Sequence, residues 1–320
     1  MNPRRQLGAA LLAAMLTVAL VATLAAGALW QQWRSVEIES AERTRVQSSW
    51  ILTGALDWAR LILREDARSS TDHLGEPWAV PLQEARLSTF LAADQNNNAE
   101  ASDADNVFLS GDITDLQAKL NVTILVEAAS VKAENLESFQ RLFDVLGLPQ
   151  AELGRMVDNL RFASDISTEN LSAQQAPLLP QRVGQLVWLG LSPQTAAALE
   201  PYVTVLPVST PINLNTASAQ VIYAVGRDFG LADAQRVVSE REHQPFRVLT
   251  DVKPLLPEGA TFAQGSVSVG SRFFQVRGRL RIDDVVIEER SLVQRDGLNV
   301  RTLQRERGGF ETAAPAPSVR

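Results

Sequence analysis

Oxygen-bearing side chains alternate along one polar stretch of the chain, and they are the residues whose types and spacing could bind a metal ion. Asp94, Asn96 and Asn98 occupy every second position, and Asp105 is the twelfth residue counted from Asp94. Calcium-binding loops place carboxylate and amide oxygens in such a pattern. The stretch departs from it at Ala99, where the sharp turn of a calcium loop needs glycine. Calcium is therefore the one cofactor that these residues suggest, and a solvated loop is the plainer interpretation.

The chain has few of the residue types on which catalytic sites depend. It contains no cysteine, and its two histidines, His73 and His243, fall in a predicted loop and at a predicted helix end. No G-x-S-x-G motif is present, and no pattern pairs two carboxylates for acid-base chemistry. A net charge of −7 also argues against a general binder of polyanions such as nucleic acid. We therefore expect no catalytic residue and no enzymatic activity.

A long uncharged segment near the N-terminus predicts a membrane-spanning helix. Residues 6–33 carry no charge, and only three residues between Ala9 and Trp30 are not apolar. As a helix, Ala9–Trp30 would be about 33 Å long, enough to cross a hydrocarbon core of about 30 Å. Arg4 and Arg5 stand before it and predict a cytoplasmic N-terminus, with the rest of the chain across the membrane. The alternative is a cleaved signal peptide, for which the apolar run is too long.

The helical pattern continues beyond this segment to about Asp66. Ile51, Ala55, Trp58 and Ile62 recur at helical spacing and predict one buried stripe, which Leu52, Leu56 and Leu63 widen. We expect Trp58, Trp78 and Trp188 to be core residues.

The remaining chain alternates between two hydrophobic periods. Residues 107–113 and 119–126 predict two strands of a hairpin. Short helical segments with closely spaced breakers then fill residues 130–257, and period-two strands return from Phe274 to Gln304. Neither group of strands forms a stable sheet alone. The pattern therefore predicts an α+β fold, in which one antiparallel sheet packs on the long helix and a large helical domain is inserted between its strands.

This layout resembles that of type IV pilin-like proteins. Residues 4–12 (RRQLGAALL) are similar to the end of a prepilin leader, which is short and basic and ends in glycine. Further segments resemble the minor pseudopilin K family of the type II secretion system: 63–79 (LREDARSSTDHLGEPWA), 109–121 (LSGDITDLQAKLN), 202–218 (YVTVLPVSTPINLNTAS), 271–274 (SRFF) and 291–295 (SLVQR). Taken in order, these segments cover most of the chain.

The resemblance implies how the chain is processed, where it resides and what it binds. In this family a prepilin peptidase cuts after the leader glycine, here between Gly8 and Ala9, and the new N-terminal residue is methylated. The fifth mature residue would be Ala13, where most pilin-like subunits carry glutamate, and its absence is typical of a tip subunit. The implied role is to start pseudopilus assembly with the minor pseudopilins I and J, for export of folded proteins across the outer membrane.

The same resemblance divides the chain into segments. They are a leader (1–8), the membrane-spanning part of the long helix (9–30), its periplasmic part (31–66), the first part of a pilin-like domain with a hairpin (67–129), an inserted helical domain (130–257), the closing strands of the sheet (258–308) and a disordered tail (309–320). The protein would be a single-pass protein of the cell inner membrane.

Two other functions share some of these features. Residues 212–251 resemble half of a helix-hairpin-helix DNA module, and the inserted domain is expected to be SAM-like or helix-hairpin-helix-like. The Gly-x-Gly turn that binds phosphate is missing, however, and Asp228 and Asp233 lie nearby, so we expect no nucleic acid partner. A minor pilin of a type IV pilus is the other alternative. Family members bind calcium near a dense acidic motif, but the matching residues 156–166 keep only two aspartates, so no metal site is transferred.

Overall fold

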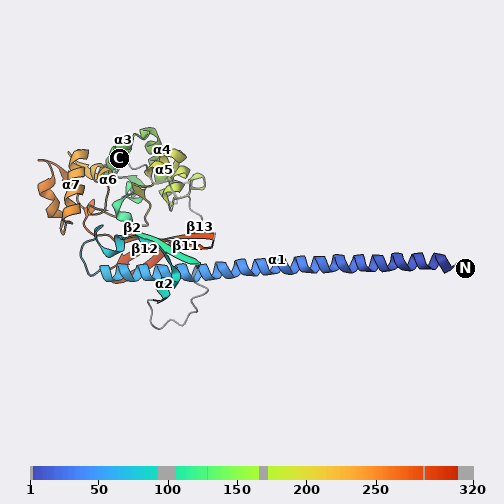
Figure 1. Ribbon diagram of the computed structural model, residues 1–320. Helices are drawn as coiled ribbons and strands as arrows, with labels where there is room; N and C mark the ends of the chain where they lie inside the picture. Colours follow the sequence, from blue (N-terminus) through green and yellow to red (C-terminus); the bar gives the residue numbers. More distant parts are fainter. Residues whose placement is uncertain (1–2, 93–105, 128, 166–171, 284, 309–320) are drawn as a thin grey trace. The chain divides into compact units, whose positions relative to one another are not determined.

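The computed structural model describes residues 3–92, 106–127, 129–165, 172–283 and 285–308 (Figure 1). The chain forms two compact units, Met1–Gly54 and Ala55–Arg320. The calcium-loop candidates Asp94, Asn96, Asn98 and Asp105 lie outside the described residues, and so does the tail 309–320. Both of those expectations therefore stay predictions.

Helix α1 (Pro3–Asp66) runs without a break from the start of the described chain. Proline fits its first turn, where the missing N–H would have no partner inside the helix. By length and composition the helix is long and apolar enough to cross a membrane. It forms the first unit and contributes residues 55–66 to the second.

A five-stranded antiparallel sheet is the centre of the second unit, and its strands lie in the order β1-β2-β11-β12-β13. A tight turn at Gly297, with φ of 56°, joins the last two strands. Strands β2 and β11 are neighbours in the sheet, although the whole helical block lies between them in the chain (Figure 1). The predicted α+β architecture is therefore confirmed. The strands are β1 (Leu82–Arg86), β2 (Val107–Asp115), β11 (Phe273–Ile282), β12 (Val285–Asp296) and β13 (Asn299–Gly308).

The hairpin expected from residues 107–113 and 119–126 is wrong. Strand β2 pairs with β1 on one side and with β11 on the other. The second half of the expected hairpin instead gives β3 (Leu120–Asn121), which pairs in parallel with β6 (Val203–Thr204) of the helical block. Asp115 caps a 3-10 turn at Leu116–Ala118 by accepting a hydrogen bond from the Gln117 N–H, and this turn redirects the chain out of the sheet.

The end of α1 packs on one face of the sheet. Leu56, Ala59 and Leu63 are buried, and the sheet residues against them are Phe274, Val276, Val293 and Val300. Trp78 joins this core, with its ring 5.3 Å from that of Phe274 in an edge-to-face arrangement. Figure 1 shows the helical block on the opposite face.

Trp78 is the only one of the three expected core tryptophans that is buried. Trp58 is 51% exposed and Trp188 is 45% exposed, so those two predictions are wrong. On α1 the predicted stripe is right for Leu56 and Leu63, which are buried, and Ile62 packs against the same core, whereas Trp58 is exposed and the neighbouring Ala59 is buried instead. A smooth row of leucines and alanine lets the helix approach the sheet more closely than a row containing tryptophan.

The helical block is a second core of short helices, and residues from Leu120 to Val267 make up its buried cluster. Ser192 and Ser218 cap two of the helices, since each hydroxyl accepts a hydrogen bond from the backbone three residues on. Gly147 and Gly190 end two others in the left-handed conformation. The α-helices are α3 (Ala133–Leu146), α4 (Gln150–Ser164), α5 (Pro193–Leu199), α6 (Ala219–Val225) and α7 (Leu231–His243), and the longer 3-10 helices are η6 (Val183–Leu189) and η7 (Leu249–Leu255).

The remaining elements are short. Two-residue ladders join β7 (Ile212–Asn213) to β10 (Val267–Ser268), β4 (Val126–Glu127) to β5 (Ser130–Val131), and β8 (Gly226–Arg227) to β9 (Thr261–Phe262). Single turns of 3-10 helix lie at η1 (Pro77–Ala79), η3 (Leu116–Ala118), η4 (Val122–Leu125) and η5 (Ala173–Gln175), and α2 (Leu87–Ala92) follows β1.

Candidate functional site: a buried polar junction

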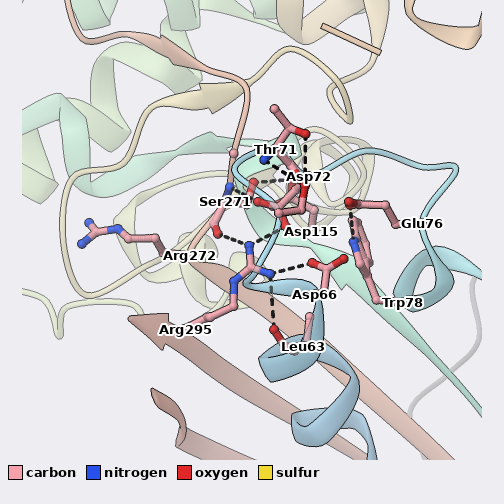
Figure 2. A network of polar contacts seen from close by, with 12 residues as sticks. Leu63, Asp66, Thr71, Asp72, Glu76, Trp78, Asp115, Ser271, Arg272 and Arg295 are labelled. Atoms are coloured by element: carbon pink, nitrogen blue, oxygen red, sulfur yellow. Dashed lines mark hydrogen bonds and ion pairs between the residues drawn. The ribbon is translucent and has the colours of Figure 1, made fainter. Parts of the chain in front are cut away.

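Polar side chains from distant parts of the chain meet where the end of α1, the sheet and the helical block come together (Figure 2). We call this set the polar junction. Its members are Asp66 at the end of α1, Asp72 in the segment that follows, Asp115 at the end of β2, Asn213 in β7, Ser271 before β11 and Arg295 in β12.

Arg295 is the cation of the polar junction. Its guanidinium donates to a carboxylate oxygen of Asp66 at 2.7 Å, to Asp72, and to the carbonyl of Ser271 at 2.9 Å. It also lies 3.4 Å from the carbonyl of Leu63, in the last turn of α1. A positive group at this end of a helix offsets the partial negative charge of the unpaired carbonyls. Arg295 therefore fixes the end of α1 to the sheet.

Arg295 also contacts an aromatic ring of the core. Its guanidinium carbon lies 4.9 Å from the ring centroid of Phe274, within the range of a cation–π interaction. The Arg295 side chain is 8% exposed, so the charge is held almost entirely by protein groups.

Asp115 joins the sheet to the helical block. Its carboxylate accepts hydrogen bonds from the hydroxyls of Ser271 and Thr216, both at 2.6 Å, and from the Gln117 N–H at 2.7 Å. Asn213 Nδ2 donates to the same carboxylate at 3.1 Å. Burial raises the pKa of Asp115 to about 6, because desolvation of the charge outweighs these hydrogen bonds.

Asn213 is fully buried and bridges three segments of the chain. Its Nδ2 donates to the carbonyl of Asp72 at 3.1 Å and to the hydroxyl of Ser271 at 3.0 Å, as well as to Asp115. Its Oδ1 accepts from the N–H of Asn215 at 3.0 Å. One amide thus positions the segment after α1, the sheet and β7 with respect to one another.

Asn215 and Arg241 hold the rest of this segment in place. The Asn215 side chain donates to the Phe246 carbonyl and accepts from the Phe246 N–H, both at 2.9 Å. Arg241, on α7, donates to the carbonyls of Leu214 and Ala217 at 2.5 Å. Polar residues in the sequence INLNTAS therefore satisfy buried backbone groups, which explains why the segment is polar although it lies inside the protein.

Carboxylates are in excess around the polar junction. Oxygen atoms of Asp66, Asp72 and Glu76 all lie within 4.8 Å of one another. Burial raises the pKa of Asp66 to about 7 despite the hydrogen bond from Arg295, and the carboxylates of Glu76 and Asp72 act in the same direction. Glu76 accepts hydrogen bonds from the His73 N–H and from Trp78 Nε1 at 2.9 and 2.8 Å. Arg295 and these N–H groups donate hydrogen bonds to the carboxylates, so the three acidic side chains hold neighbouring segments of the protein together.

The structure places the predicted processing residues Gly8 and Ala9, and the predicted tip-subunit residue Ala13, in α1. Their roles concern a peptidase and partner subunits, and they stay predictions.

The turn before α7 bears on the DNA-binding alternative. The N–H of Gly230, at the start of that helix, donates to a carboxylate oxygen of Asp233 at 2.8 Å. The same carboxylate pairs with Arg236. A backbone amide that a DNA phosphate would need is therefore occupied by an acidic side chain.

The polar junction was not predicted from the sequence. The segments quoted for the family resemblance contain all six of its members, but nothing in them indicated that Asp72, Asp115 and Arg295 would meet. One signal was available: Arg295 lies two residues after Val293 and therefore shares the core-facing side of β12. A charge on that side of a strand needs a buried partner.

A long helix, an antiparallel sheet on its C-terminal part, and a helical block inserted between two adjacent strands define a protein of the pilin-like class, and the helix is long and apolar enough for a membrane anchor. Among solved structures, a chain of the GspK–GspI–GspJ complex from the type 2 secretion system of enterotoxigenic Escherichia coli has the same fold. Its TM-score is 0.60 at 18% identity, with 84% of this chain and 99% of that chain covered.

Sequence comparisons agree with one another. Two family profiles described as type II secretion system (T2SS), protein K match residues 118–208 and 212–269. Type II secretion system protein K of Pseudomonas aeruginosa is 29% identical, over 96% of this chain and 91% of the relative. The protein of that name from Dickeya chrysanthemi is 28% identical, over 98% and 99%. The chain belongs to the protein K family of the type II secretion system.

Proposed function

We propose that this chain is a minor pseudopilin, anchored in the inner membrane by α1, that acts at the tip of the pseudopilus. Its N-terminus lies in the cytoplasm and the sheet and helical block lie in the periplasm. There it starts assembly and supports export of folded proteins across the outer membrane. The role is structural and does not involve catalysis.

The observation that carries this proposal is the attachment of the helical block. The block is inserted between β2 and β11 and is joined to the sheet by buried hydrogen bonds of Asp115 and Asn213. Because these groups are desolvated, breaking them costs more than breaking exposed hydrogen bonds. A bulky block held in this way would obstruct the next subunit inside a narrow filament, whereas a tip subunit has no successor.

The N-terminal residues support the same role. Cleavage between Gly8 and Ala9 would make Ala13 the fifth residue of the mature helix. A charged side chain in the centre of the bilayer costs about 2.5–3.5 kcal/mol on insertion scales. A glutamate there is worthwhile only if it pairs with the terminal amine of a subunit ahead, so alanine suits a subunit with none ahead.

We propose the minor pseudopilins I and J as partners, in line with the complex named above. The exposed face of α1 supplies a candidate contact, because Trp58 and Leu61 are each 51% exposed on the side away from the buried Leu56 and Leu63. Large aromatic side chains of this kind are typical anchors of protein interfaces.

Two measurements test the proposed function. Mass spectrometry of the N-terminal peptide of the membrane-extracted protein should show a chain that begins at methylated Ala9. A mature chain that retains Met1–Gly8, or that begins near residue 28, contradicts the processing of a pilin-like subunit. Co-purification should recover a complex with pseudopilins I and J. Recovery with type IV pilus subunits instead would favour the minor pilin alternative.

A further inference from the structure

Two tryptophans and an arginine lie where the uncharged run of α1 ends. Trp30 and Trp33 are 60% and 64% exposed, and Arg34 is the first charged residue after the run. On a helix, positions 30, 33 and 34 fall within an arc of about 100° and therefore share one face. The guanidinium carbon of Arg34 lies 5.6 Å from the centroid of the Trp30 ring. The end of the run is thus marked by a one-sided group of aromatic and cationic side chains.

The position of this group along the helix matches the edge of a bilayer. If the middle of Ala9–Trp30 lies at the bilayer centre, Trp30 lies about 16 Å from it and Trp33 about 20 Å, at 1.5 Å per residue. Half of the hydrocarbon core is about 15 Å thick, and the headgroup layer extends to about 20–22 Å. Both rings therefore fall in the headgroup layer, and Arg34 falls at its outer edge. Trp50 lies about 46 Å from the same centre, well beyond the bilayer.

We propose that Trp30, Trp33 and Arg34 form an interfacial anchor that binds the phospholipid headgroup layer on the side of the soluble part of the chain. An indole ring suits this layer because it pairs an apolar body with one N–H donor. A guanidinium at the same level meets lipid phosphates, which it binds well. The occupant of this helix face is therefore lipid, because the face continues directly from the membrane-spanning segment.

The anchor would determine the depth and the rotation of α1 in the membrane. Because the three side chains share one face, their contacts with the headgroups are most favourable when the helix tilts that face toward the headgroup layer. Replacing both tryptophans by leucine lengthens the apolar run without supplying an N–H group, so the helix should sink further into the bilayer. This inference rests on the proposed membrane insertion of α1, and the experiment below separates the two.

The test uses the full-length protein in vesicles of phosphatidylethanolamine and phosphatidylglycerol in equal parts, with bromines placed either near the headgroups or near the bilayer centre. We expect shallow bromines to quench wild-type tryptophan fluorescence more than deep ones, and the double variant Trp30→Phe/Trp33→Phe to lose that difference. Trp50→Phe is the matched control, since Trp50 is also an exposed tryptophan of α1 and its removal should leave the difference unchanged.

A second measurement reports the depth of the helix itself. The chain has no cysteine, so Ser35→Cys is a unique site for a water-soluble maleimide. Labelling of this site in vesicles should be slower in the Trp30→Leu/Trp33→Leu background than in the otherwise wild-type chain. Equal labelling rates, or equal quenching by shallow and deep bromines, would overturn the anchor. Failure of the protein to float with the vesicles would overturn membrane insertion as well, so the two failures are distinguishable.

Discussion

Replacing Arg295 by methionine tests the polar junction most directly. Methionine keeps a long unbranched side chain that still packs on the Phe274 ring, but it removes the guanidinium. The partners Asp66 and Asp72 have side chains that are 9% and 4% exposed. The variant therefore leaves two buried carboxylates without the cation that both of them contact.

The expected loss of stability follows from that burial. Removing one partner of a buried ion pair typically destabilises a protein by about 3–5 kcal/mol. The carboxylates can limit the loss by binding protons, and Asp66 already has a pKa of about 7 in the presence of Arg295. We therefore expect a loss of about 3–5 kcal/mol near pH 8 and a clearly smaller loss near pH 5, where protonation neutralises the buried charges.

Urea unfolding of the full-length protein in detergent micelles measures this loss. Tryptophan fluorescence reports the transition, because Trp78 is 2% exposed and lies beside Phe274. Arg301→Met is the matched control on the neighbouring strand β13, where the arginine is 57% exposed and its nearest acidic oxygen, in Asp296, is 3.8 Å away. A surface pair of that kind contributes about 0–1 kcal/mol.

Two results would refute the reasoning. The first is an Arg295→Met variant that loses no more stability than Arg301→Met. The second is a loss that stays constant between pH 5 and pH 8, because uncompensated buried carboxylates must respond to protonation.

Three further predictions follow from the structure. Because burial raises the pKa of Asp115 from 3.8 to about 6, the folded chain binds more protons than the unfolded chain in that range, and stability falls as pH rises through it. Asp115→Asn should reduce this total pH-dependent change in the free energy of unfolding by up to about 3 kcal/mol, measured by urea unfolding at a series of pH values. An unchanged pH dependence would contradict the assignment. Gly111→Ala should lower the thermal midpoint by an amount equivalent to about 1–3 kcal/mol, since a Cβ there would lie 2.5 Å from the Arg277 carbonyl; an unchanged midpoint would show that the strands yield easily. Trp58→Ala should weaken co-purification with pseudopilins I and J, whereas Trp188→Ala, similarly exposed but in the helical block, should not; equal effects would count against the α1 contact.

Local patterns in the sequence predicted the elements of this protein well. Strand β11 alternates apolar residues and glycine with glutamine and arginines, and Gly297 marks the turn before β13, so periodicity and turn chemistry sufficed there. The breakers of the helical block likewise separated its short helices. These signals depend only on residues a few positions apart, which is why a single sequence reveals them.

Pairing over long distances was not visible in the same way. Residues 119–126 have the composition of a strand, yet they leave the sheet because β11, which is far away in the chain, takes the place beside β2. One position on the buried face of α1 was also misassigned, because Trp58 and Ala59 both fit an apolar stripe. Only the shape of the facing sheet decides which of them is buried.

The sequence by itself determined that this protein has an uncharged helix long enough to span a membrane, an α+β head and no cysteine chemistry, since composition and periodicity are properties of the chain alone. The tertiary structure decided the polar junction. Asp66 and Arg295 are 229 positions apart and Asp115 and Ser271 are 156 apart, so no local pattern relates them. They become partners because folding removes them from water together, and a buried charge must then find its hydrogen bonds within the protein.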